Sequence, residues 1–115
     1  MNDAASPQLA ANWSRQLRKG VLELLVLLRL TDREYYGYEL VQAVTESADG
    51  DVAEGTLYPL LNRLAKRELI SSRWEQMSSG RRRRYYRITP LGRSALEEMT
   101  RRWFKLDRAI RKLTP

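Results

Sequence analysis

The chain has 115 residues, 43% of them hydrophobic and 30% charged, which predicts one globular domain and excludes a disordered segment. It contains no histidine and no cysteine, so disulfides and the usual His- or Cys-based catalytic and zinc sites are excluded. The N-terminus lacks a signal pattern, and the longest apolar run is too short to span a bilayer. We therefore expect a cytoplasmic protein that is not an enzyme and has no catalytic residues, metal, cofactor or membrane partner.

The positive charge is concentrated in one part of the chain. Residues 63–87 hold nine lysines and arginines but two acidic residues, so this window carries +7, equal to the net charge of the whole chain. Residues 1–62 carry −4 and residues 88–115 carry +4. This concentration is typical of a protein that binds a polyanion, and the alternative is a solvated basic surface without a ligand.

The N-terminal part divides into an arm and a strongly apolar helix. Residues 1–14 lack apolar periodicity, and we expect them to form a flexible arm. Residues 15–30 show helical spacing with an apolar surface so wide that it must be covered on several sides, by the domain itself or by another subunit. The positions that we assign to a subunit interface are Leu17, Val21, Leu24 and Leu28.

The middle of the chain predicts a connector and two further helices. Residues 31–36 form the connector, residues 37–47 a second helix, and residues 49–51 (Asp-Gly-Asp) a turn. A third helix follows, with Thr56 as a possible N-cap and Pro59 near its start. Its leucines share one face, which leaves the other face to Tyr58, Asn62, Arg63 and Lys66.

Residues 70–76 and 83–88 predict two short strands joined by a polar, Gly-containing tip, which is a hairpin. In the second strand, alternation places Arg84, Tyr86 and Ile88 on one face. Arg83, Tyr85 and Arg87 fall on the other face. The hairpin therefore cannot direct all of its arginines to one ligand.

Thr89-Pro90 is a strong start signal for a last helix that reaches about Leu113. Apolar residues recur there at intervals of three and four, the spacing of a coiled-coil seam, although a stripe facing the domain's own core is the alternative. A helix of this length would extend beyond so small a core, and we expect a homodimer. The seam residues assigned to the dimer interface are Leu96, Met99, Trp103, Leu106, Ile110 and Leu113.

Several stretches of the sequence together resemble the PadR family of bacterial transcriptional regulators. They are KGVLELLVLLRL from Lys19, YGYEL from Tyr36, GTLYPLLNRLAKRELI from Gly55 and GRRRRYYRITPLGR from Gly80. With a single helix after the hairpin, the chain resembles the short subfamily, which has one C-terminal helix. One departure is Glu68, where the family usually has glycine, which puts in doubt how the third helix ends.

The resemblance implies an α+β winged helix-turn-helix of three helices and a two-stranded wing, followed by a long C-terminal dimerisation helix. The implied domains are an arm (1–14), a DNA-binding domain (15–89) and the dimerisation helix (90–115). It also implies a homodimeric repressor of a pseudo-palindromic double-stranded DNA operator. The expected DNA-binding residues are Tyr38, Thr56, Tyr58, Asn62, Arg63, Lys66, Arg81, Arg82, Arg83 and Arg84.

Family members that respond to drugs stack aromatic compounds on a tryptophan of the last helix. The resemblance therefore implies a small aromatic or cationic effector at Trp103, with Trp13 as a possible extension of the site. Plain packing of the interface without a ligand is the alternative. A different function is a membrane-surface protein that uses the basic, amphipathic last helix. That function leaves the hairpin motif unexplained.

Overall fold

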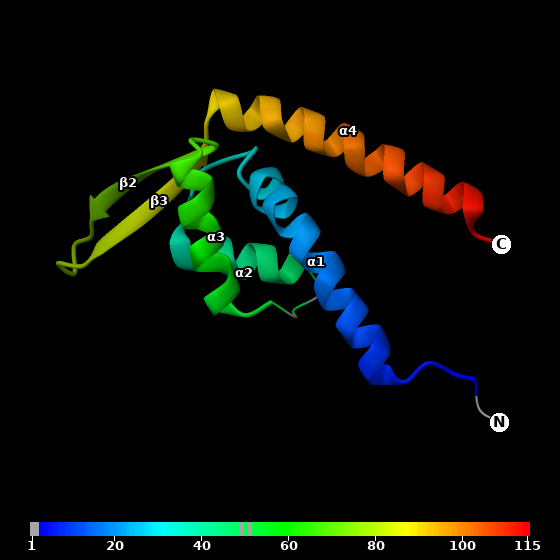
Figure 1. Cartoon of the computed structure of the whole chain (residues 1–115). Coiled ribbons are helices and arrows are strands. Elements are labelled where there is room, and N and C mark those ends of the chain that lie inside the picture. Colours follow the sequence, from blue (N-terminus) through cyan, green and yellow to red (C-terminus); the bar gives the residue numbers. More distant parts are fainter. Residues whose placement is uncertain (1–2, 49, 51) are drawn as a thin grey trace.

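The computed structural model describes residues 3–48, 50 and 52–115. The elements follow in the order α1 (Pro7–Arg29), β1 (Tyr35–Tyr36), α2 (Gly37–Ser47), α3 (Glu54–Lys66), β2 (Ile70–Gln76), β3 (Arg82–Ile88) and α4 (Pro90–Leu113). The strands form one antiparallel sheet in the order β1-β3-β2. The β2–β3 hairpin projects from the helices as a wing (Figure 1), which confirms the predicted α+β winged-helix fold.

The core is built from the apolar faces of the first three helices and the base of the sheet. The largest side chains that are almost fully buried are leucines of α1, α2 and α3, together with Ile70 at the start of β2. Helix α1 packs against both α2 and α4. Helix α3 lies between α1 and the wing (Figure 1).

The predicted flexible arm is shorter than the sequence suggested. Helix α1 begins at Pro7, so residues 7–14 are helical and only residues 3–6 of the described chain precede it. The Ser6 hydroxyl accepts a hydrogen bond from the Leu9 N–H at 3.2 Å, which is an N-cap, and proline follows it in the first turn. The large apolar side chains of this part of α1, Leu9 and Trp13, are one turn apart but extend beyond the core and stay exposed, so the helical pattern is short and was missed.

Two details of the middle segment also differ from the prediction. Helix α3 begins at Glu54 after Ala53 as N-cap, so Thr56 is not the cap and Pro59 lies inside the helix. The predicted connector contains β1, in which Tyr35 pairs with Tyr86 of β3, because a two-residue strand is too short to show a sequence period. Two residues of the predicted turn, 49 and 51, lie outside the described residues.

The backbone conformation of Glu68 shows how α3 ends without the glycine that is usual in the family. It adopts a left-handed conformation with φ of 61°. The Leu69 N–H donates to the Leu64 carbonyl and the Glu68 N–H donates to the Ala65 carbonyl, both at 3.0 Å. These two bonds are a Schellman motif, so the helix keeps the glycine-type ending and glutamate bears the conformational cost.

The chain is elongated because α1 and α4 extend past the core on the side away from the wing (Figure 1). Its radius of gyration is 17.1 Å, whereas a compact domain of this length has about 13 Å. Only Gly92 and Leu96 of α4 are buried. Most of the last helix is therefore not covered by its own domain.

Candidate nucleic-acid interface

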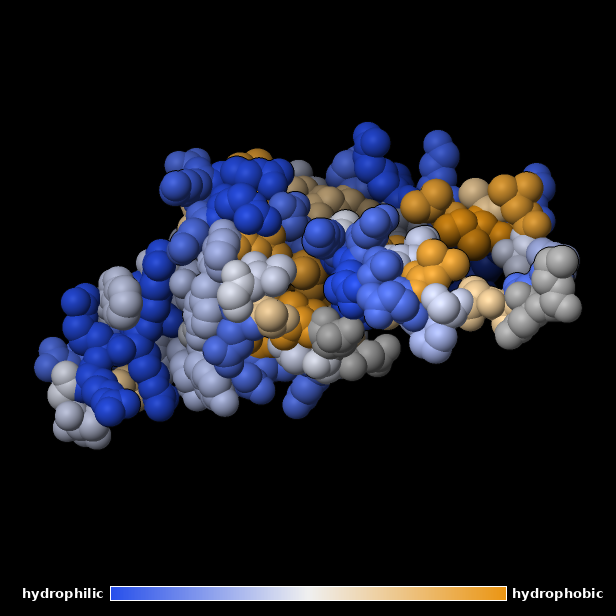
Figure 2. All heavy atoms as spheres, turned by 60° about the horizontal axis from the view of Figure 1, so that its bottom comes forward, coloured by the Kyte–Doolittle hydropathy of each residue, from blue (hydrophilic) through white to orange (hydrophobic). Residues whose placement is uncertain are grey.

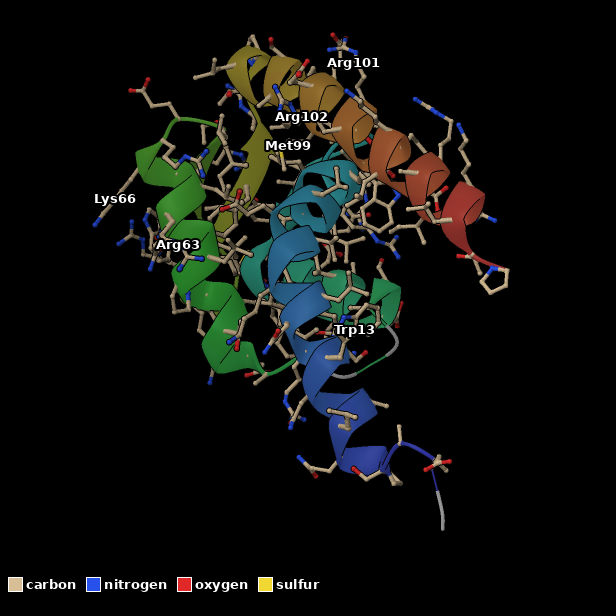
Figure 3. All side chains as sticks on the ribbon, turned by 45° about the vertical axis from the view of Figure 1, so that its right-hand side comes forward. Trp13, Arg63, Lys66, Met99, Arg101 and Arg102 are labelled. Carbon is tan, nitrogen blue, oxygen red and sulfur yellow. The ribbon has the colours of Figure 1, made fainter. Side chains whose placement is uncertain are left out.

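The exposed face of α3 carries polar and basic side chains. Its leucines, Leu57, Leu60, Leu61 and Leu64, point into the core. All five DNA-binding residues predicted on this helix are exposed: Thr56, Tyr58, Asn62, Arg63 and Lys66. Lys66 extends from α3 away from the other helices (Figure 3), whereas Arg63 lies beside the groove between α3 and α1. The helix can therefore present hydrogen-bonding groups and positive charge to a ligand along its whole length.

Two tyrosines add hydroxyl groups beside this face. Tyr38 lies in the first turn of α2 with 56% of its surface exposed, and Tyr58 on α3 has 38% exposed. Burial raises the pKa of Tyr58, and the nearby Glu54 carboxylate raises it further. The Tyr58 hydroxyl thus remains protonated at neutral pH and can donate a hydrogen bond to an anion.

Pairing in the wing divides its arginines between two faces. On β3, Arg82 and Arg84 lie on the same face as Trp74 of β2, which is the register partner of Arg84. Arg83 and Arg87 lie on the opposite face, paired in register with Glu75 and Ser71. This division confirms the alternation predicted for the second strand. Arg81 precedes β3 in the exposed tip.

The two faces of the wing differ in charge. On the face of Arg83, acidic groups are close: Arg73 forms ion pairs with Glu34 and, at 3.5 Å, with Glu75. Among the residues that the structure describes, no ion pair involves Arg82 or Arg84. Within the same residues Arg83 and Arg87 form no ion pair either, but Arg83 lies opposite Glu75 across the strands. The face of Arg82 and Arg84 is therefore the one that carries positive charge without an acidic neighbour.

This basic face and α3 enclose one groove of about 710 Å³. The groove is lined by residues of α2, α3, both wing strands and the wing tip: Tyr36, Gly37, Tyr38, Tyr58, Asn62, Trp74, Met77, Ser78, Ser79, Arg81, Arg82, Arg83, Arg84 and Tyr86. Seven of the predicted DNA-binding residues line it, whereas Thr56, Arg63 and Lys66 lie outside it. Trp74 is a lining residue that the sequence analysis missed, although its place opposite Arg84 in the predicted hairpin was a usable signal.

Comparison with known proteins places the chain in a family. The model of the PadR-like transcriptional regulator family matches residues 24–98. The chain is 36% identical over 96 residues to the transcriptional regulator Rv3488 of Mycobacterium tuberculosis, which covers 84% of this chain and 88% of that protein. This chain belongs to the PadR family. It is therefore a DNA-binding transcriptional regulator.

Solved structures of PadR proteins share the architecture. A PadR family regulator from Eggerthella lenta is 34% identical, with a TM-score of 0.82 over 92% of each chain. A PadR-like regulator from Bacillus cereus is 38% identical, with a TM-score of 0.76 over 85% of this chain and 95% of that one.

The seam predicted on α4 of this PadR protein divides into two parts. Leu96 is buried in the domain's own core and Met99 packs against it beneath the helix (Figure 3), so these two hold α4 to its own domain. Trp103 is half-buried, and the remaining three are exposed by 54% or more: Leu106, Ile110 and Leu113. The alternative prediction, a stripe that faces the domain's own core, therefore holds only for the first part of the seam.

Trp103 lies in a groove between α1 and α4 of about 600 Å³. Predicted interface residues of α1 line the same groove: Leu17, Val21, Leu24 and Leu28. Trp13 does not line it; it lies on the N-terminal half of α1 with 64% of its surface exposed (Figure 3).

Hydrophilic side chains cover the wing end of the molecule, whereas hydrophobic side chains reach the surface at the opposite end (Figure 2).

No helix within the described ranges is long and apolar enough to cross a bilayer. Three of the basic side chains on α4 that suggested a membrane surface also have acidic partners one turn away. Glu98 pairs with Arg101 and Arg102, and Asp107 pairs with Arg111 at 3.0 Å. This pairing lowers the free positive charge that an anionic lipid surface would attract.

Proposed function

We propose that this PadR protein is a homodimeric repressor that binds a pseudo-palindromic operator in double-stranded DNA. The observation that carries the proposal is the single groove that joins the polar face of α3 to the uncompensated arginines of the wing. In helix-turn-helix proteins the second helix of the pair enters the major groove and other elements contact the backbone. We assign base reading to α3 and backbone contacts to Arg82 and Arg84.

The exposed surface of the chain supports a dimer. The accessible area is 8500 Å², whereas a compact monomer of 13.5 kDa exposes about 6500 Å². The excess of roughly 2000 Å² is comparable with the area that one subunit buries in a large obligate dimer interface. A second copy packed along α1 and the exposed part of α4 would cover the apolar side chains there and bring two copies of α3 to one operator.

A small effector is a further part of the proposal. A planar aromatic molecule that stacks on Trp103 would lie where α4 meets α1, and so at the proposed subunit interface. By changing the distance between the two reading helices, it would release the operator and permit transcription. Quenching of Trp103 fluorescence by such a compound, together with release of bound duplex and loss of both effects in Trp103→Ala, would support this part.

The test of DNA binding uses the two faces of the wing. Arg82→Ala/Arg84→Ala should weaken binding to a labelled duplex and make the plot of log affinity against log salt shallower by about 2, because each lost phosphate contact removes roughly 0.9 of a counterion. The matched control is Arg73→Ala/Arg87→Ala, which removes the same charge from the opposite face, outside the groove, and should change the slope far less. Equal slopes for both pairs would contradict the assignment.

Selection of bound sequences from a random duplex pool then tests the symmetry of the operator. Recovery of an inverted repeat, with half-site centres separated by about one helical turn, supports a dimer that places two α3 helices in successive major grooves. A single, unrepeated site would contradict it. Placing the recovered site at a promoter and measuring transcription with and without the protein separates repression from activation.

A further inference from the structure

Trp74 lies exposed on the basic face of the wing, close to two arginines. Its side chain has 56% of its surface exposed, which is unusual for the largest apolar side chain of the hairpin. The guanidinium carbon of Arg82 lies 4.8 Å from the centroid of the indole ring, and that of Arg84 lies 5.9 Å from it. Both distances are within the range of cation–π contacts. The wing thus presents an aromatic ring with two cations beside it on the neighbouring strand.

The neighbouring contacts keep this trio in place on β2 and β3. Trp74 and Arg84 are register partners across the two strands. Arg84 also donates a hydrogen bond to the Ser72 hydroxyl at 2.9 Å and lies 5.1 Å from the ring of Tyr86, which is buried. Arg84 is therefore held against the base of the wing, and the indole ring beside it faces the groove shared with α3.

The order of groups along a DNA strand complements this arrangement. Each deoxyribose has an apolar face and stands between two phosphates, which gives the order anion, apolar ring, anion. When α3 occupies the major groove and the wing lies beside it, one DNA strand must pass between these two elements. The groove bounded by α3, Trp74 and the two arginines is the space available for that strand.

We propose that Trp74 is a DNA-contacting residue whose indole ring packs on a deoxyribose of the strand between α3 and the wing, while Arg82 and Arg84 bind the phosphates on either side. This inference rests on the proposed function, because it requires α3 to occupy the major groove. Trp74 contributes an apolar contact and no charge. It therefore increases affinity without adding to the salt dependence of binding.

The first experiment observes Trp74 directly. The full-length protein is labelled with 5-fluorotryptophan, and its three tryptophan signals are assigned with Trp→Phe variants. On titration with a duplex, the ¹⁹F signal of Trp74 should shift and lose solvent accessibility, whereas that of Trp13 should remain unchanged. Fluorescence anisotropy of the labelled duplex, measured on the same samples, reports binding independently.

The second experiment compares affinities over a range of salt concentrations. Trp74→Ala should raise the Kd about tenfold at every salt concentration with an unchanged slope, and Trp74→Phe should retain most of the affinity. An unmoved Trp74 signal at saturating duplex overturns the inference, and so does a shallower slope for Trp74→Ala, which would mean that Trp74 only positions the arginines. If the unsubstituted protein does not bind duplex at all, the proposed function fails instead.

Discussion

The hydroxyl of Thr89 donates a hydrogen bond to the backbone carbonyl of Glu68 at 2.6 Å. The same hydroxyl accepts a hydrogen bond from the Gly92 N–H at 2.9 Å, which makes Thr89 the N-cap of α4. One side chain thus connects the end of α3, the proposed DNA-reading helix, to the start of α4. Because α4 carries the exposed seam proposed for dimerisation, this junction would set where α3 stands relative to a second subunit.

Removal of the Thr89 hydroxyl should weaken this junction. We expect Thr89→Ala to lower the free energy of unfolding by about 1 kcal/mol, the usual cost of losing an N-cap side chain. Thr89→Ser keeps the hydroxyl and should restore most of the stability. Denaturant midpoints of the three proteins provide the measurement, and equal midpoints for the alanine and serine variants would contradict the role of the cap.

The residue that the junction holds is itself strained. Glu68→Gly should raise the free energy of unfolding by about 1 kcal/mol, because glycine adopts a φ of 61° without the steric cost of a Cβ atom. Glu68→Ala is the matched control, since it removes the carboxylate but keeps the Cβ atom. A similar gain in both variants would show that charge, and not backbone conformation, limits stability there.

Gly92 is required because α4 approaches the end of α3 closely. A Cβ atom at Gly92 would collide with the backbone carbonyl of Leu69, which cannot move aside as a flexible side chain would. We expect Gly92→Ala to destabilise the protein by about 1–3 kcal/mol, as overpacking does. Gly20→Ala in α1 is the opposite case, because its Cβ atom would meet nothing within 4 Å. That substitution should leave the free energy of unfolding unchanged or raise it by up to about 1 kcal/mol. Thermal unfolding of both variants provides the measurement.

The exposed part of α4 should determine the oligomeric state. Sedimentation equilibrium at micromolar concentration should give about twice the monomer mass of 13.5 kDa. Ile110→Glu should shift the protein to the monomer mass, because it places a charge in the proposed interface while leaving the monomer core intact. Arg108→Glu, on the other side of α4, is the control and should remain dimeric. A monomeric unsubstituted protein would overturn the dimer.

Alkaline pH should reveal the burial of Tyr86. Burial raises the pKa of Tyr86, and the nearby Arg84 lowers it by a smaller amount. Below pH about 10, tyrosine is protonated in both the folded and the unfolded chain, so its ionisation does not yet favour the unfolded chain. As the pH rises further, the unfolded chain loses its proton first, so the free energy of unfolding falls. Tyr86→Phe should reduce this fall in denaturant titrations between pH 9 and 11, and an unchanged pH profile would contradict the shift.

Elements with a buried face were predictable from local pattern. The second helix was placed correctly at residues 37–47, and the first strand of the wing at residues 70–76. The alternation of Arg83 and Arg84 between the faces of the second strand was also correct. These predictions succeeded because burial imposes a period of 3.6 or 2 on the sequence. The start of α1 has no buried face, and β1 is too short for a period.

The winged-helix fold, the concentration of positive charge near the wing and the apolar seam of α4 all follow from patterns in the sequence. The tertiary structure was needed to find the acidic partner of Arg73, because Glu34 reaches it from a loop that is distant in the sequence. The tertiary structure also decided that Leu96 belongs to the core while Ile110 remains exposed, since the seam continues unchanged where the domain beneath it ends. Local spacing sets which face of an element a residue occupies, whereas the assembly of the elements sets what that face meets.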